Sequence, residues 1–307
     1  MRKSELPVNK KSIRHLSRRV KSATAAALGE AAHKAARREI LTTPKPGLVD
    51  AMGSGCHKDM THETLLASAM ALSPFWQLQA QVGLDGTPPQ DAFPKLRAAG
   101  IKMDAAMFSA TGGINAHKGL IYCMSLLLYG AGFAIYGKTP LTADAVAGFA
   151  ADSARGSVEN ELLPLKQRDT GKTLTNGERL FLRYGVTGIR GEAEHAFPSI
   201  TEAGLPALLD ALKNGADIND AAICALLAIM EVNEDSNVIH RGGFDFWKDE
   251  YKKITREARR KFRPGSGDYS PIEYLEKKFT PIGVSPGGAA DLLACTLFLH
   301  STIFPAC

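Results

Sequence analysis

The most distinctive chemistry-bearing stretch of this chain is Thr111–Gly119, which reads TGGINAHKG and precedes the apolar run Leu120–Leu128. Its glycines let backbone N–H groups come close to a ligand, and the apolar run predicts a helix. Four residues are then expected at or just before the helix N-terminus: Gly113, Asn115, His117 and Lys118. Such a position binds phosphate, because unpaired N–H groups and the helix dipole both favour an anion. A glycine turn that only precedes a buried helix can have the same sequence, so other residues have to support the phosphate-binding interpretation.

Further polar, glycine-bearing segments interrupt helices that are otherwise rich in alanine. Their acidic side chains are Asp50, Asp59, Glu192, Glu194, Asp235 and Asp291. The basic side chains, with those of the first stretch, are Lys45, His57, His117, Lys118, Arg190 and Arg241. Carboxylates hold Mg²⁺ while Lys, Arg and backbone N–H groups bind phosphate oxygens, so this set is typical of a site for a polyphosphate with a divalent cation. Any single acid is more often a helix cap or half of a surface ion pair, and no Walker A sequence is present.

The composition is that of an ordinary globular protein. Of 307 residues, 45% are hydrophobic and 22% are charged, and the formal net charge is +5. Lys and Arg are concentrated at residues 2–21 and 252–263. Because no aromatic residues alternate with these cations, a solvated helix face is favoured over a nucleic-acid site. No nucleic-acid partner is therefore expected.

Cysteine usage and hydropathy indicate where the protein works. The five cysteines are widely spaced and form no CxxC pair, which favours reduced thiols in the cytoplasm over a disulfide framework or a zinc knuckle. The basic N-terminal residues precede no apolar signal core, and no apolar run approaches the roughly 20 residues that cross a bilayer. We expect a soluble, cytoplasmic protein with no membrane partner.

Periodicity and proline positions predict the elements that carry these residues. Helices are expected over residues 12–41, 61–81, 91–109, 120–128, 142–154, 205–214, 217–232, 244–261 and 292–300. A break is expected at 130–140, and loops at 185–194 and 233–243. Pro44 and Pro46 predict a rigid extended loop that continues past His57 and Asp59. Ser285 is expected as a helix N-cap, with Pro286 in the first turn.

Strand signals are nearly absent, so the fold class is all-α. We expect a basic N-terminal arm at residues 1–10 and one multi-helix globular domain at 11–307, whose glycine-bearing loops form a single nucleotide site.

Seven segments, in this order, resemble the triphosphoribosyl-dephospho-CoA synthase family. They are Thr43–Asp50, Gly55–Met60, Ala110–Gly119, Gly188–Glu194, Asp235–Asn237, Arg241–Gly243 and Ser285–Leu293. The resemblance covers residues 41–299 and implies an all-α enzyme. It implies that C1 of the ATP ribose is joined to the 2′-hydroxyl of 3′-dephospho-CoA, with release of adenine and retention of the triphosphate. The family's product is the prosthetic-group precursor of citrate lyase, and a related branch serves malonate decarboxylase.

The resemblance also implies roles for the candidate residues. The nucleotide-binding set is Lys45, Gly113, Asn115, Lys118, Arg190, Asn237, Arg241, Gly287 and Gly288. Asp50, Asp59, Glu192 and Asp235 are the expected Mg²⁺ ligands. The expected catalytic residues are His57, Asp59, His117 and Glu192. Carboxylates can stabilise the oxocarbenium character at C1, and His57 or His117 can transfer a proton. A separate transferase would carry the product to the acyl carrier protein of citrate lyase.

Departures from the family pattern leave alternatives. Ala51, Gly53, Ala116, Ser236 and Ala289 differ from the residues that are common at these places in the family. The sequence of Gly53–Gly55 resembles that of the malonate branch. The sequences of Asn176–Leu180 and Met107–Phe108 resemble those of the citrate branch, which we favour. An all-α, Mg²⁺-dependent ADP-ribosyl or nucleoside hydrolase would use the same acids with water as acceptor. A nucleotide-binding regulatory protein would bind ATP without forming adenine.

Overall fold

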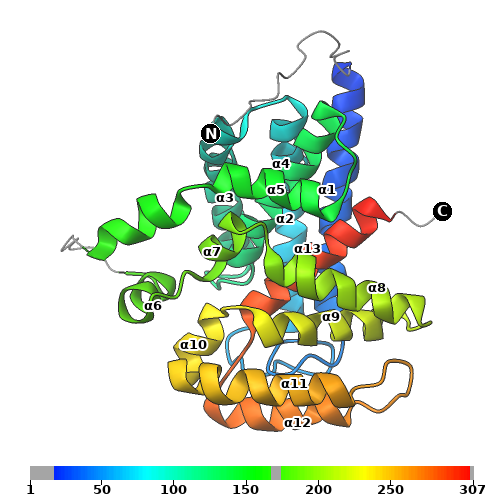
Figure 1. Ribbon diagram of the computed structural model, residues 1–307, viewed down its shortest axis with the longest axis vertical. Helices are drawn as coiled ribbons and strands as arrows, with labels where there is room; N and C mark the ends of the chain where they lie inside the picture. The colour runs from blue at the N-terminus through cyan, green and yellow to red at the C-terminus, as the bar shows by residue number, and fades with distance from the viewer. Residues whose placement is uncertain (1–16, 167–173, 305–307) are drawn as a thin grey trace, which may run out of the picture.

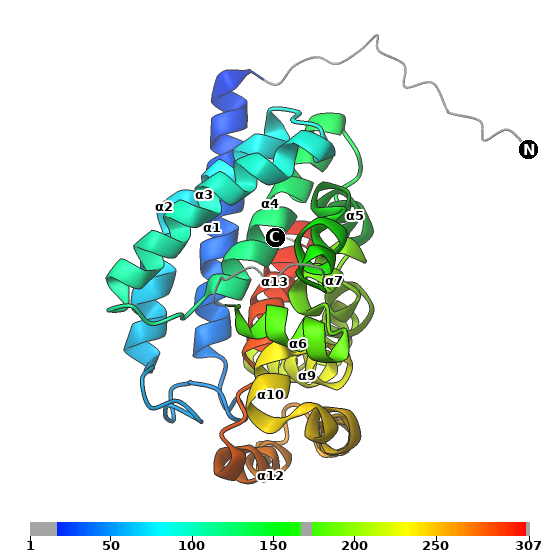
Figure 2. The same cartoon turned by 90° about the vertical axis from the view of Figure 1, so that its left-hand side faces the viewer.

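The apolar run that follows the TGGINAHKG stretch forms a helix at the centre of the molecule (Figure 1). In the computed structural model, which describes residues 17–166 and 174–304, α4 spans Lys118–Gly137. It packs against α2 (His62–Leu84), α5 (Ala143–Ala154) and α13 (Gly287–Ile303). Figures 1 and 2 show α13 beside α1 (Arg18–Leu41), although these two helices lie near opposite ends of the chain.

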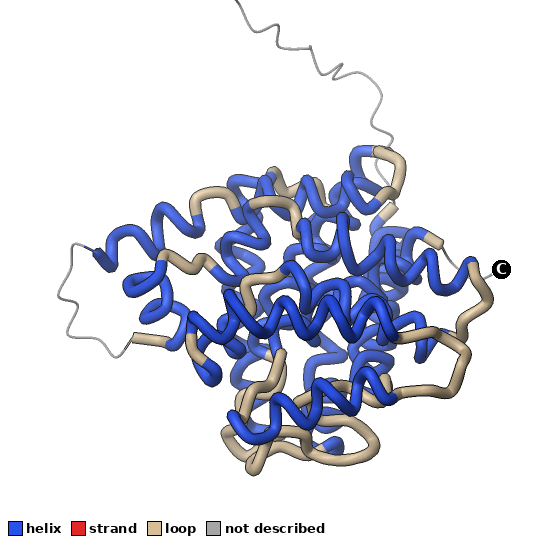
Figure 3. The backbone as a smooth tube through the Cα atoms, turned by 60° about the horizontal axis from the view of Figure 1, so that its bottom comes forward, coloured by secondary structure: helices blue, strands red, loops and turns tan. Residues whose placement is uncertain are grey.

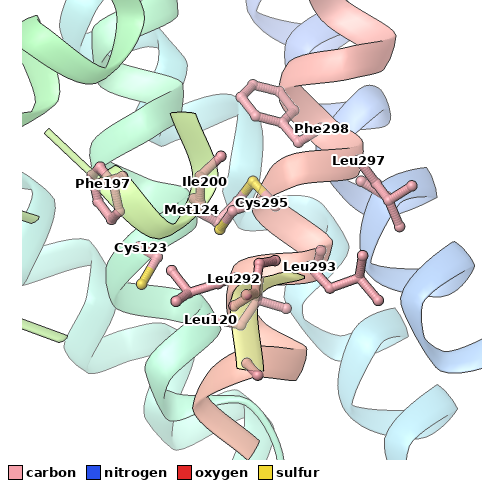
Figure 4. Close-up of a cluster of buried hydrophobic side chains, with 14 of the residues drawn as sticks. Leu120, Cys123, Met124, Phe197, Ile200, Leu292, Leu293, Cys295, Leu297 and Phe298 are labelled. Atoms are coloured by element: carbon pink, nitrogen blue, oxygen red, sulfur yellow. The ribbon is translucent and has the colours of Figure 1, made fainter. Parts of the chain in front are cut away.

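The contact between α4 and α13 is an apolar layer (Figure 4). Leu120, Cys123 and Met124 of α4 face Leu292 and Cys295 of α13, and all five are 2% exposed or less. Burying Leu or Met side chains stabilises a fold by about 1.5–3 kcal/mol each. The hydrophobic effect thus places the N-terminal end of α4 next to that of α13.

The remaining helices surround this centre. Their bounds are α3 (Pro89–Ala110), η1 (Val158–Leu162), η2 (Leu163–Lys166), α6 (Asn176–Tyr184), α7 (Gly188–Glu194), η3 (Ser199–Gly204), α8 (Leu205–Lys213), α9 (Ile218–Val232), α10 (Ser236–Gly242), η4 (Phe246–Tyr251), α11 (Lys252–Lys261), α12 (Ser270–Phe279) and η5 (Thr280–Ile282). The described part of the chain contains no strand, only an isolated bridge between Asp50 and Gly53 (Figure 3). The all-α prediction is confirmed.

Helix α4 is longer than predicted. The expected break at residues 130–140 is wrong, because the helix continues through Gly130 and Gly132 to Gly137. These two glycines are contact points: a Cβ on Gly130 would overlap the carbonyl of Val146 in α5, and one on Gly132 would overlap that of Ala80 in α2. Glycine here serves close helix packing and not a turn.

The length of α4 also corrects the expectation that no apolar segment approaches the length needed to cross a bilayer. With 20 residues and a mean hydropathy of 1.6, it is long and apolar enough to cross a bilayer. Because 72% of its apolar window is buried inside the protein, we interpret it as a buried core helix.

Two predicted loops are short helices. Residues 188–194 form α7 and residues 236–242 form α10, and α12 was not anticipated at all. The polar, glycine-bearing sequence of α7 and α10 has weak helix propensity, so tertiary packing decides their conformation. The expected arm at residues 1–10 and the start of the first expected helix, residues 12–16, lie outside the described residues.

The glycine contacts around α4 generate a stability prediction. A methyl group on Gly83 of α2 would overlap the backbone of Tyr129 in α4. We expect Gly83→Ala to lower the free energy of unfolding by about 1–3 kcal/mol or more, because the two helices have to separate. Gly148→Ala is the matched control, because nothing lies within 4 Å of its Cβ position inside α5. It should raise stability by about 0.5–1 kcal/mol. Urea unfolding of both variants measures this, and an unchanged midpoint for Gly83→Ala would contradict it.

Candidate active site

Three helix N-termini, those of α4, α10 and α13, meet at one place in the fold. Asp235 is the N-cap of α10, and its Oδ1 accepts a hydrogen bond from the Asn237 N–H at 2.9 Å. Its Oδ2 accepts from the Ala289 N–H of α13, also at 2.9 Å. Asp291 of α13 in turn lies at the backbone N–H of Leu120 in α4. We call this region the helix cradle, defined by Asp235, Asp291 and the first turns of these three helices.

Asp235 is a buried cap shared by two helices. It is 2% exposed, and burial raises the pKa of its carboxyl, against the opposing effect of four backbone N–H groups. It replaces the cap that the sequence predicted for α13. Ser285 does not cap that helix, whose N-cap is Pro286 without a side-chain hydrogen bond. Instead, the Ser285 Oγ lies 2.8 Å from His57 Nε2.

Glycines admit the two carboxylates to the cradle. A Cβ on Gly288 would lie 3.0 Å from the Asp235 Cγ, and a Cβ on Gly287 would lie 3.0 Å from the Asn237 Nδ2. A Cβ on Gly119 would overlap the Asp291 Oδ2. The three glycines of the sequence motifs are therefore needed so that acidic and amide side chains can approach a helix backbone.

Asp291 has the most perturbed carboxyl in the cradle. Burial raises its pKa well above the ordinary value, and the nearby charges of Glu39 and Asp235 add to the effect. Only the Leu120 N–H opposes the shift. The residue as a whole is half-buried and, among the described residues, its carboxyl pairs with no cation. A carboxylate with a raised pKa is a stronger base than an ordinary one, which suits it to accept a proton from a substrate.

A buried ion pair closes the cradle on the side of α1. Lys45, which is 2% exposed, donates from Nζ to the Glu39 Oε1 at 2.5 Å and to the Glu39 carbonyl oxygen at 2.8 Å. Asp50 holds the loop around Lys45, accepting from the Lys45 N–H at 2.8 Å and the Met52 N–H at 2.7 Å. These contacts give Lys45 and Asp50 roles in holding the loop.

The two candidate histidines differ in their environment. Burial is the main cause that lowers the pKa of His117 to about 4, and the charge of Lys45 adds to it. The His117 Nδ1 lies 2.7 Å from the Ser68 Oγ. His57 is less buried; desolvation and the charge of Arg241 lower its pKa, while Asp59, 3.8 Å from its Nδ1, opposes them. His117 is therefore neutral at pH 7.

The comparisons with known proteins decide the family. A sequence model of the CitG family, ATP:dephospho-CoA triphosphoribosyl transferase, matches residues 25–303. The chain belongs to this family. A 2-(5''-triphosphoribosyl)-3'-dephosphocoenzyme-A synthase of Streptococcus mutans serotype c is 37% identical over 288 residues, which cover 89% of this chain and 95% of the relative. The protein of the same description from Vibrio cholerae serotype O1 is 33% identical over 282 residues, covering 90% and 88%.

A solved structure supports the fold. A crystal structure from Archaeoglobus fulgidus, described as a triphosphoribosyl-dephospho-CoA synthase, superimposes with a TM-score of 0.51 at 17% identity. The match covers 78% of this chain and 99% of that one. The resemblance found in the sequence, the transferase class and the all-α fold are thus confirmed.

Some predicted phosphate ligands of this CitG-family chain lie at the rim of the cradle. Lys118 is 56% exposed, with its Nζ 3.9 Å from the Asp104 Oδ2, and its backbone N–H donates to the Asn115 Oδ1. Gly113 has a positive φ of 92° and open space around its Cβ position. Arg241 is exposed and donates to the Gly283 carbonyl oxygen at 3.2 Å. These groups can be reached by a ligand.

Arg190 and Glu192 both lie on α7 but have separate partners. Arg190 Nε donates to the Glu161 Oε2 at 3.0 Å. The Glu192 oxygens accept from the Ser199 N–H at 2.8 Å and from its Oγ at 2.9 Å, so this carboxylate joins α7 to η3. Burial raises the pKa of Glu192, and the Ser199 hydrogen bonds oppose the shift.

The four predicted metal ligands do not form a cage. Within residues 17–166 and 174–304, no group of three or more His, Cys, Asp or Glu side chains is placed to hold one metal ion. Asp50, Glu192 and Asp235 each accept backbone N–H groups. Asp59, 68% exposed beside His57, is the one of the four that accepts none among the described residues. Mg²⁺ is often held by one or two carboxylates together with substrate phosphates. The four predicted ligands fit this kind of site and do not fit a site built from protein ligands alone.

Sequence reasoning missed three contributors to the cradle. Glu39, Ser68 and Asp291 were given no role, although Asp291 was counted among the loop acids. Glu39 follows Ala35 and Ala36 on the buried face of α1, and a charge on an apolar helix face is a signal that could have found it. Ser68 has no such signal, because a serine is unremarkable inside a helix.

The buried His117 predicts acid sensitivity. Since its pKa in the folded protein is about 4, below the unfolded value of 6.5, the unfolded chain binds this proton first as the pH falls. Stability should therefore fall from pH 6.5 downward, by about 3 kcal/mol once the pH is below 4. We expect His117→Asn to lack this component in urea unfolding across that range. His240→Asn, on an exposed residue of α10, is the control. An equal acid loss in His117→Asn and the parent would refute the assignment.

Proposed function

We propose that the helix cradle binds the triphosphate of ATP and that Asp291 activates the 2′-hydroxyl of 3′-dephospho-CoA. The observation that carries the proposal is the raised pKa of Asp291, a half-buried residue whose carboxyl lies among three helix N-termini. The positive ends of the helix dipoles and the exposed cations at the rim favour phosphate, and the carboxylate favours a proton. One site therefore offers both an anion cradle and a base.

The bond changes follow from the family's reaction. The 2′-oxygen forms a bond to C1 of the ATP ribose, the bond from C1 to the adenine nitrogen breaks, and adenine leaves with a proton. The Asp291 carboxylate is negative while positive charge develops at C1 and stabilises that charge; it then takes the proton of the hydroxyl as the new bond forms. A single displacement inverts C1, as conversion of a β-nucleotide to an α-riboside requires.

Rim residues fit the triphosphate. Lys118 and Arg241 are exposed cations, and Gly113 presents backbone without a side chain. We assign Mg²⁺ to the triphosphate with Asp59 as its protein carboxylate, because Asp59 accepts no backbone N–H group in the described part of the chain. The metal neutralises phosphate charge when bound. His57, between Asp59 and Ser285, orients this edge of the site and is our candidate for protonating adenine.

The product determines the place in metabolism that we propose. A triphosphoribosyl-dephospho-CoA is a precursor that a separate transferase attaches to an acyl carrier protein, and we favour the carrier of citrate lyase over that of malonate decarboxylase. A cytoplasmic location agrees with the four described cysteines, Cys56, Cys123, Cys224 and Cys295, which form no disulfide.

Adenine release tests the reaction class. With ATP and Mg²⁺, we expect adenine by chromatography only when 3′-dephospho-CoA is present, together with a product heavier by one triphosphoribosyl group. Adenine formed without the acceptor would establish the hydrolase instead. ATP binding without adenine would favour the regulatory protein.

The role of Asp291 has its own test. We expect Asp291→Asn to lower kcat by about 100-fold to 10,000-fold with little change in the KM for ATP, because the amide cannot accept the proton. In the parent, kcat should fall as the pH drops through the raised pKa of Asp291, and the variant should lose this limb. Asp144→Asn, on an exposed acid in the first turn of α5, is the control. A folded Asp291→Asn with kcat within about twofold of the parent would reject the role.

A further inference from the structure

A buried serine and a buried histidine are hydrogen-bonded to each other beside the cradle. The His117 Nδ1 lies 2.7 Å from the Ser68 Oγ, and the two residues are 4% and 0% exposed. Ser68 belongs to α2, whereas His117 is the N-cap residue of α4. A hydrogen bond between two buried side chains restricts the orientation of both. The serine therefore decides which way the imidazole faces.

The Ser68 hydroxyl donates this hydrogen bond. A serine hydroxyl has one hydrogen to donate, and inside a helix its usual alternative acceptor is the carbonyl oxygen four residues earlier. The hydroxyls of Thr111 and Thr296 donate to such carbonyls, at 2.9 and 2.8 Å. In the described part of the chain, the only hydrogen-bond partner of the Ser68 Oγ is the His117 Nδ1. Because a buried hydroxyl hydrogen without an acceptor is costly, this hydrogen points to Nδ1.

The other ring nitrogen of His117 then carries the hydrogen of the imidazole. A neutral imidazole has one N–H and one acceptor nitrogen, so a hydrogen bond accepted at Nδ1 leaves the hydrogen on Nε2. The ring is neutral at pH 7, since its pKa is lowered to about 4, mainly by burial and also by the charge of Lys45. Within residues 17–166 and 174–304, Nε2 has no hydrogen-bond partner and is not completely enclosed. His117 therefore offers an uncharged N–H donor that water or a ligand atom can contact.

The surroundings of this donor favour an anionic acceptor. His117 gives α4 no side-chain cap, and the first turn of that helix is the positive end of its dipole. The charge of Lys45 acts on the imidazole, and the exposed Lys118 follows it directly in the chain. The acidic groups nearby are Glu39, which pairs with Lys45, and Asp291, the proposed base. A negatively charged oxygen brought by a ligand is the acceptor that suits the N–H best.

We propose that Ser68 is a positioning residue that holds the His117 Nε2–H toward the cradle, where this N–H donates to a phosphate oxygen of the bound triphosphate. The inference deepens the function proposed for the cradle and rests on it. It gives His117 a binding role in place of the proton transfer expected from the sequence. Because the imidazole stays uncharged, it contributes a donor beside Lys45 and Lys118 without repelling them.

Two substitutions separate the two ring nitrogens of His117. The amide nitrogen of Gln lies about where Nε2 lies in His, and the amide nitrogen of Asn lies about where Nδ1 lies. His117→Gln therefore keeps the donor toward the cradle, whereas His117→Asn keeps a polar group at Ser68 and loses that donor. We expect His117→Asn to raise the KM for ATP and the Kd for inorganic tripolyphosphate by about tenfold. In His117→Gln, both constants should rise by no more than about threefold.

The remaining variants test the serine and control for folding. Ser68→Ala removes the donor to Nδ1 but keeps the imidazole, so we expect both constants to rise by about threefold. His300→Asn is the matched control, because His300 lies in the last turn of α13, at the end of that helix away from the cradle. It should leave both constants as they are in the parent. Circular dichroism and the urea midpoint show whether each variant is folded.

The tautomer of His117 gives a readout that a merely structural role would not produce. In ¹⁵N NMR of protein labelled at histidine, we expect the parent at pH 7 to carry the hydrogen on Nε2 and none on Nδ1. The signals are assigned by their loss in His117→Asn. Tripolyphosphate should shift the Nε2 signal and leave the ring neutral, and in Ser68→Ala the hydrogen should be shared between the two nitrogens. A hydrogen on Nδ1 in the parent, or an imidazolium in the complex, would overturn the proposal.

The outcomes separate this inference from the function proposed for the cradle. A parent that forms no adenine contradicts that function, yet tripolyphosphate binding by His117→Asn and His117→Gln still decides the role of His117. An active parent whose His117→Asn variant binds tripolyphosphate equally well overturns this inference alone. Equal losses in the Asn and Gln variants overturn it too, because Gln keeps the donor, and so does a parent that does not bind tripolyphosphate.

Discussion

The carboxylate of Asp235 is the interaction on which the site depends. A buried charge costs several kcal/mol unless hydrogen bonds compensate it. Here the compensation comes from the N–H groups of two helices that are far apart in the sequence, α10 and α13. The N-termini of α10 and α13 each need hydrogen-bond acceptors, and the buried carboxylate needs donors. The Asp235 side chain meets all three needs at once. The same contact, made by the Ala289 N–H, sets the position of Asp291, two residues further along α13.

Close packing of apolar helices supplies the second constraint. Helix α4 is buried along most of its length, and glycines on both sides let its backbone approach those of α2 and α5. Because the apolar layer between α4 and α13 extends to their first turns, His117 and Asp291 are held at one end of it. Hydrophobic burial thus provides the rigidity that a site built on helix ends needs.

The charged residues of the motifs have different tasks. Lys45 with Glu39, Asp50 with its loop, and Glu192 with Ser199 are saturated by partners of this chain. Lys118, Arg241 and Asp59 remain exposed at the rim. Saturated groups shape the cradle, and we propose that the exposed groups contact the substrate, although the sequence alone does not distinguish the two kinds. This distinction also separates Asp235, a structural cap, from Asp291, a candidate base.

Local sequence determined which segments are helical wherever propensity and periodicity agree, as in α1, α2, α3, α5 and α9, and it determined the family through the order of its motifs. The apolar run and its glycine stretch placed His117 and Lys118 correctly at a helix start. Tertiary structure alone decided that Gly130 and Gly132 continue a helix, that residues 188–194 and 236–242 are helical, and that Asp235 caps α13 in place of Ser285. The reason is physical: a cap or a close helix contact depends on a partner brought from elsewhere in the chain. The burial that raises the pKa of Asp291 likewise exists only once α1, α4, α10 and α13 have packed.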